Sequence, residues 1–264
     1  MKVLKYCLWA LLPVALIAAG GYYAWMVYGT TVSNPHNYQR VSDINPPRGF
    51  ERVTGADPTL TAFLRALPLR ERGTRTQLFT GGDADRQPLN YAVIDLPMLS
   101  NAEQCADVCM RLRSEFLFST GRFADIHFSD VDGGIQQYGG GDSRDSLVRY
   151  LRHVYEVSNT FSLSRELSVR PLPEIQPGDV FVYAAVDRVG EKLGHAVTVI
   201  DVAREPRTGR VCVLLAEGNT PARNIHVVRN LRDRWLSPWF AIDEKADSIR
   251  FSTFSYAPTE LRHF

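Results

Sequence analysis

The sequence predicts an α+β domain in which helices pack on an antiparallel sheet, preceded by one N-terminal transmembrane helix. Three patterns predict this architecture. An uncharged apolar run lies near the N-terminus, helical periodicity dominates the middle of the chain, and short β-rich runs separated by turn residues fill the C-terminal half. Helices that precede the strands, rather than alternate with them, favour an α+β domain over a βαβ repeat.

The apolar run extends from Tyr6 to Tyr28 and contains no charged residue. At ~1.5 Å per residue it is long enough to cross a ~30 Å hydrocarbon core. Lys2 and Lys5 precede the run, and the first basic residue after it is Arg40, so the positive-inside bias places the N-terminus in the cytoplasm. We therefore expect a single-pass membrane protein with an exported domain. A cleaved signal peptide is the alternative, and it also exports the domain.

These patterns divide the chain into three regions. Residues 1–29 are assigned to a cytoplasmic tip and transmembrane anchor, residues 30–49 to a linker, and residues 50–264 to a single globular domain. The linker assignment rests on proline, asparagine and glycine residues with little apolar periodicity. The 30 basic and 29 acidic residues nearly balance, and there is no basic run or glycine-rich phosphate loop. No nucleic-acid or nucleotide partner is therefore expected.

Helical periodicity is clearest in a segment that begins near Ser100. The stretch from Ser100 to Glu103 fits a capping box, and apolar residues then recur at helical spacing as far as Leu117. This start places Cys105 in the early turns of the helix. Amphipathic patterns predict two further helices, Thr59–Leu67 and Ser143–Val157.

Strand predictions rest on short runs of β-branched and other apolar residues. Turn residues such as those of Pro206–Gly209 separate the runs, which suits an antiparallel sheet built from hairpins. The predicted strands are Tyr91–Leu96, Asp179–Ala185, Ala196–Val202, Val211–Ala216 and Ile225–Val228.

Three residues fit the requirements of a cysteine hydrolase. Such an enzyme needs a thiolate near a helix N-terminus, an imidazole within reach of it, and a polar group that orients the imidazole. Cys105 lies near a helix start, His195 begins a strand, and Glu217 ends the next strand, where a hairpin brings it beside His195. We take them as the nucleophile, the base and the orienting group, with Asn219 as a weaker substitute for Glu217.

Each candidate has a structural alternative. Cys105 could be an inert core cysteine that packs beside Cys109, His195 a strand-edge histidine bonded to backbone, and Glu217 an exposed turn residue. His127 and His226 lie between β-formers, where a structural hydrogen bond is the default. No metal-binding spacing such as Cys-x-x-Cys occurs, so neither a metal nor another cofactor is expected.

Several motifs resemble known families. The Gly178–Asp179 turn, the Gly194–His195 strand and the upstream helical cysteine resemble the NlpC-type papain-like cell-wall cysteine peptidases and amidases. Over most of residues 49–264, the chain more closely resembles an uncharacterised bacterial envelope family known only as a domain of unknown function. The matching stretches include Phe63–Leu69, Gln104–Asp107, Asp125–Phe128, Gly178–Phe181, Gly194–Val197 and Leu236–Trp239.

The resemblance implies a papain-like architecture and an amide-hydrolysing or acyl-transferring activity on peptidoglycan or another envelope peptide. It also implies a bacterial inner-membrane protein, anchored through residues 6–28, with its domain in the periplasm. The alternative is a non-catalytic binding or scaffolding protein on the same fold. One departure stands out, because the cell-wall enzymes carry their cysteine nearer the helix start than the capping box at Ser100 places Cys105.

Overall fold

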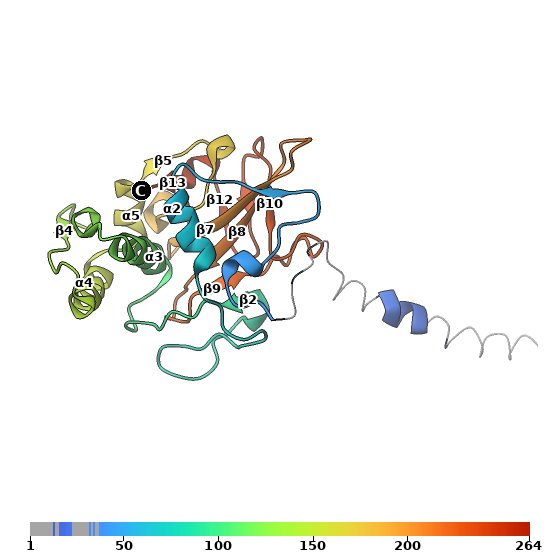
Figure 1. The fold of residues 1–264 in the computed structure, drawn as a ribbon, viewed down its shortest axis with the longest axis horizontal. Coiled ribbons are helices and arrows are strands. Elements are labelled where there is room, and N and C mark those ends of the chain that lie inside the picture. Colours follow the sequence, from blue (N-terminus) through green and yellow to red (C-terminus); the bar gives the residue numbers. More distant parts are fainter. Residues whose placement is uncertain (1–12, 14–15, 23–31, 33, 35–36) are drawn as a thin grey trace, which may run out of the picture.

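The computed structural model describes residues 13, 16–22, 32, 34 and 37–264 (Figure 1). Most of the predicted anchor, residues 6–28, lies outside these residues, although residues 16–22 are helical. Among the residues that are described, no helix is long and apolar enough to cross a membrane. The anchor therefore stays a prediction.

A nine-stranded sheet forms the centre of the domain, and all of its strand pairs are antiparallel. The main path runs β2-β9-β8-β7-β6-β13-β5, with β1 paired to β7 and β10 paired to β8. Its strands are β1 (Glu51–Arg52), β2 (Asn90–Val93), β5 (Ser168–Val169), β6 (Val180–Tyr183), β7 (His195–Arg204), β8 (Val211–Glu217), β9 (His226–Val228), β10 (Phe240–Ile242) and β13 (Leu261–His263). Two separate hairpins pair β3 (His127–Ser129) with β4 (Ile135–Gln137) and β11 (Ile249–Arg250) with β12 (Ser255–Tyr256).

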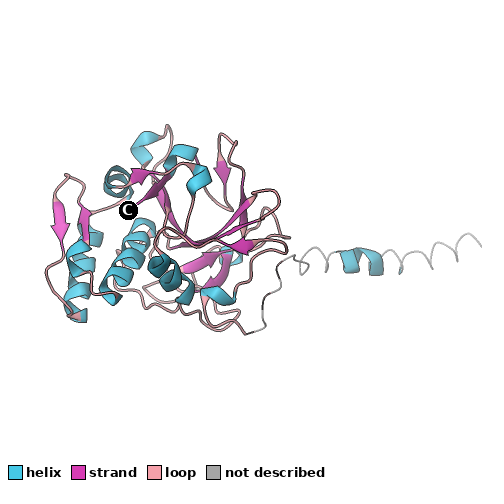
Figure 2. Cartoon of the chain, turned by 45° about the horizontal axis from the view of Figure 1, so that its top comes forward, coloured by secondary structure: helices cyan, strands magenta, loops and turns pink. Residues whose placement is uncertain are grey.

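The helices confirm the mixed helix and antiparallel-sheet class (Figure 2). They are α2 (Pro58–Ala66), α3 (Cys105–Ser119), α4 (Arg144–Val157) and α5 (Thr160–Glu166), and α2 and α3 pack on β7. Short 3-10 helices span Val41–Asp43, Gln87–Leu89, Phe123–Asp125, Leu172–Glu174, Ala185–Asp187 and Pro258–Glu260.

Alternating residues of the central strands face two different layers. On β6, Val180 and Val182 pack with the side chains of α3, α4 and α5. Phe181, between them, packs instead with Phe251 and Tyr256 around the β11–β12 hairpin. The helices therefore cover one face of the sheet, and the β11–β12 hairpin covers part of the other.

The start of α3 differs from the prediction. The helix begins at Cys105, with Gln104 as its N-cap, because the Asp107 carboxylate accepts the Gln104 amide hydrogen at 2.8 Å. Glu103 accepts instead from the amide of Leu99, at 2.6 Å, in the turn before the helix. The predicted capping box from Ser100 to Glu103 was therefore wrong, and Cys105 is the first residue of the helix.

The predicted linker also differs from the structure. Tyr38, Val41 and Ile44 are buried and belong to the same apolar cluster as Trp239. The Trp239 indole nitrogen donates to the Asn45 carbonyl at 2.7 Å, which ties this segment to the C-terminal part of the chain. The folded domain thus includes residues from Tyr38 onward, and residue 50 is not its boundary.

Candidate active site

Cys105 lies where helix α3 meets the β8–β9 loop. As the first residue of the helix, it lies beside backbone amides that have no partner within the helix. The loop approaches closely at Gly218, where a Cβ atom would lie 2.7 Å from Val108 Cγ2. A side chain there would force the loop away from the helix start.

The thiol of Cys105 and the ring of His195 lie close enough for each to shift the pKa of the other. Burial opposes ionisation of the thiol, but the charge and hydrogen bond of His195 and the amides of Ala196 and Ala106 outweigh it, so the pKa of Cys105 is lowered. Burial likewise disfavours the imidazolium, yet the Cys105 sulfur and then Glu217 raise the pKa of His195 to about 9. Both shifts favour a thiolate–imidazolium pair over the neutral thiol and imidazole.

Glu217 orients the imidazole. Because β7 and β8 are antiparallel, the start of β7 and the end of β8 meet at the same end of the sheet. Glu217 Oε2 lies 3.0 Å from His195 Nε2, which leaves Nδ1 of the ring for the Cys105 thiol. Burial raises the pKa of Glu217, but the hydrogen bonds from His195 and His226 lower it to about 2. The structure thus brings all three predicted residues together.

His226 also belongs to this cluster. Its Nε2 lies 3.5 Å from Glu217 Oε1, and its Nδ1 lies 3.2 Å from the Asn224 carbonyl oxygen. The strand pattern around His226 predicted only a structural hydrogen bond. It did not predict the contact between His226 and Glu217. Asn219 has a different role from the one considered, since its Oδ1 accepts the amide hydrogen of Thr220 at 2.8 Å. His127 lies on the separate β3–β4 hairpin.

The other described cysteines do not share these surroundings. Cys105, Cys109 and Cys212 are all free of disulfides. Cys109 is 1% exposed, its thiol donates to the Cys105 carbonyl at 3.5 Å, and burial strongly raises its pKa. Burial also raises the pKa of Cys212. In the described part of the chain, no group of three or more His, Cys, Asp or Glu residues is placed to hold a metal ion.

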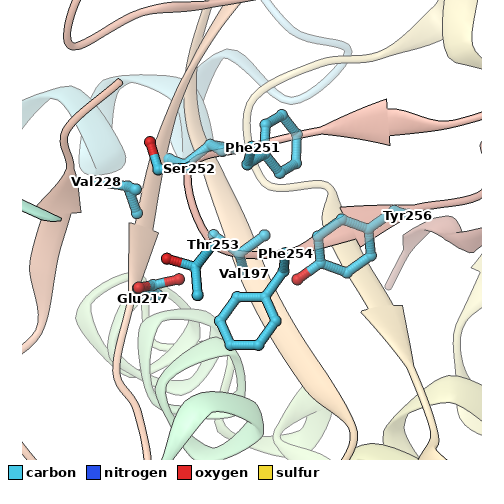
Figure 3. Close-up of a pocket in the computed structure, with 9 residues that line it drawn as sticks. Val197, Glu217, Val228, Phe251, Ser252, Thr253, Phe254 and Tyr256 are labelled. Carbon is cyan, nitrogen blue, oxygen red and sulfur yellow. The ribbon is translucent and has the colours of Figure 1, made fainter. Parts of the chain in front are cut away.

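The β11–β12 hairpin covers the site. The ring of Phe254 stacks on the ring of His195, with centroids 3.6 Å apart and planes 17° apart. Figure 3 shows Thr253, Phe254 and Glu217 around one cavity. That cavity has a volume of about 10 Å³, room for about one water molecule. Cys105 is 7% exposed and His195 only 2%, and Phe254 covers one face of the His195 ring.

Comparison with known proteins identifies a family but no activity. A family model described as "Domain of unknown function (4846)" matches residues 41–140 and 135–263, which together make up most of the chain. No curated protein matches the sequence. No solved structure matches it either.

Proposed function

This chain belongs to the family described as Domain of unknown function (4846), and we propose that it is a cysteine hydrolase or acyl transferase acting on amide bonds of a bacterial envelope substrate. The observation that carries the proposal is the order Cys105–His195–Glu217, on a helix start and two adjacent strands of an antiparallel sheet. The resemblance of the Gly178–Asp179 and Gly194–His195 motifs to NlpC-type enzymes supports a papain-like architecture and a cell-wall peptide as substrate.

The chemistry follows from the three side chains. The Cys105 thiolate attacks the carbonyl carbon of the amide, and the resulting tetrahedral intermediate carries the negative charge on oxygen. His195 gives its proton to the nitrogen of the leaving amine as the C–N bond breaks, which leaves an acyl-thioester on Cys105. His195 then takes a proton from the attacking water, or from an acceptor amine in a transferase, as the water oxygen or amine nitrogen bonds to the acyl carbon. The C–S bond breaks, which releases the product and restores the Cys105 thiolate and the protonated His195. Glu217 holds the ring throughout.

The apolar run at residues 6–28 supports an inner-membrane anchor with the domain in the periplasm, where peptidoglycan fragments are available. A second candidate is a non-catalytic envelope binding or scaffolding protein. The burial of Cys105 and the stacking of Phe254 on His195 favour that reading, because a binding protein needs no access to the thiol.

Hydrolysis of cell-wall fragments distinguishes the two candidates. We expect the full-length chain in detergent to release new amino groups from muropeptides, and Cys105→Ala to lower the rate by about 10³-fold or more, because it removes the nucleophile. Mass spectrometry of the products measures this loss. Cys212→Ala, a buried cysteine on β8, serves as the matched control and retains the rate. Equal product formation by the wild-type chain and Cys105→Ala would exclude Cys105 as the nucleophile.

A further inference from the structure

The proposed attack needs hydrogen-bond donors for the developing oxyanion. Such sites use preorganised N–H groups close to the nucleophile, commonly two. The backbone N–H of Cys105, at the first position of α3, supplies one donor because it has no partner within the helix. The second donor must lie beside the helix start. This inference rests on the proposed function and names a further catalytic residue for it.

Gln104 directly precedes the nucleophile and caps the helix. Its side chain is half-buried, and its Oε1 accepts a hydrogen bond from the Thr220 hydroxyl at 2.6 Å. An amide whose oxygen is held in this way presents its NH₂ group as a donor. No acceptor for this nitrogen occurs among the residues that the structure describes.

The β8–β9 loop preorganises this amide. The Thr220 amide donates to Asn219 Oδ1 at 2.8 Å, which fixes the residue that holds Gln104. Gly218 keeps the loop against the helix, since a Cβ atom there would lie 3.1 Å from the Gln104 carbonyl oxygen. One short segment therefore orients both partners of the nucleophile, His195 through Glu217 at its start and Gln104 through Thr220 three residues later.

We propose that the side-chain amide of Gln104 is the second oxyanion donor beside the Cys105 N–H, and that Thr220 is its positioning residue. The amide binds the carbonyl oxygen more strongly as negative charge develops on it. Its contribution therefore appears in reactions that pass through a tetrahedral oxyanion, and not in a direct displacement at carbon.

Two probes of Cys105 separate these cases. With 4-nitrophenyl acetate, the thiolate forms a bond to the acyl carbon, the carbonyl oxygen becomes an oxyanion, and 4-nitrophenolate leaves. With iodoacetamide, the thiolate displaces iodide and no oxyanion forms. We expect Gln104→Ala to slow acylation of Cys105 by about 10²-fold and Thr220→Val to slow it by about 10-fold. The ratio of the acylation rate to the alkylation rate is expected to fall by the same factors. Gln137→Ala, on the β3–β4 hairpin, is the matched glutamine control and leaves that ratio at the wild-type value.

The outcomes are distinct. An unchanged ratio of acylation to alkylation in Gln104→Ala overturns the assignment of Gln104, while fast alkylation of Cys105 leaves the hydrolase proposal standing. If Cys105 of the wild-type chain is neither acylated nor alkylated rapidly, the proposed function fails and the inference fails with it. If loss of the N-cap side chain unfolds Gln104→Ala, as circular dichroism would show, Thr220→Val decides, because it leaves Gln104 in place.

Discussion

Replacement of His195 by alanine is expected to slow alkylation of Cys105 at about pH 6 by about 10²-fold. With the imidazole present, the pKa of Cys105 is lowered, although the thiol is buried. Without it, burial is opposed only by backbone amides, and the thiol ionises no more readily than an ordinary cysteine. An ordinary thiol, with a pKa of about 8.5, is less than ~1% thiolate at this pH. The rate falls in proportion because the thiolate is the reactive form.

The measurement is the rate of iodoacetamide incorporation, with the modified cysteine located by mass spectrometry. Loss of the imidazole also opens space at the site, so Phe254→Ala is the matched control, which opens similar space and keeps the ring of His195. Glu217→Gln gives an intermediate rate, since the ring keeps a hydrogen-bond acceptor and loses the neighbouring negative charge. An equal rate in wild type and His195→Ala would show that the imidazole does not activate Cys105.

Replacement of Asp201 by alanine is expected to lower the free energy of unfolding by about 2–4 kcal/mol. Asp201 on β7 is fully buried and accepts from Arg52 Nε at 2.6 Å and from Arg65 Nε at 2.9 Å. Arg52 also donates to the Ile44 carbonyl at 2.7 Å, so the carboxylate ties the 38–44 segment and helix α2 to the sheet. Its removal leaves two guanidinium groups unpaired, although they are 23% and 19% exposed and regain some hydration.

Urea unfolding followed by circular dichroism measures this loss as a lower midpoint at an unchanged slope. Asp95→Ala is the matched control, because Asp95 pairs with Arg70 at 2.8 Å but is 53% exposed. It is expected to cost less than about 1 kcal/mol. Equal effects of the two substitutions would show that the buried cluster does not hold the N-terminal segment in place.

Much of the sheet was predictable because its signals are local. Short runs of β-branched and other apolar residues marked β7 and β8, and a hairpin between these strands predicts that His195 lies beside Glu217. The start of α3 was not predictable from the same kind of signal, since Ser100–Glu103 matches a capping box in the sequence but the structure uses Gln104 and Asp107 instead. The observed start places Cys105 at the first helical position.

The parts that the sequence did not predict depend on distant contacts. Gln104 contacts Thr220, which lies 116 residues later in the sequence, and no motif predicts this contact. Phe254 of the β11–β12 hairpin contacts His195, and no motif predicts that contact either. Val41 and Ile44 lie in a proline-rich stretch without periodicity, yet both are fully buried. Such contacts come from the tertiary fold and leave no local pattern in the chain.

Direct titration of the Cys105 thiolate tests the central claim most directly. The ultraviolet absorbance of the thiolate is recorded against pH for the chain of residues 1–264, and the curve of Cys105→Ala is subtracted. The thiolate–imidazolium pair predicts a thiolate signal that is present at neutral pH and is lost on acidification well below ~8.5. A signal that appears only above ~8.5, as for an ordinary or more deeply buried thiol, would contradict the pair and the hydrolase built on it.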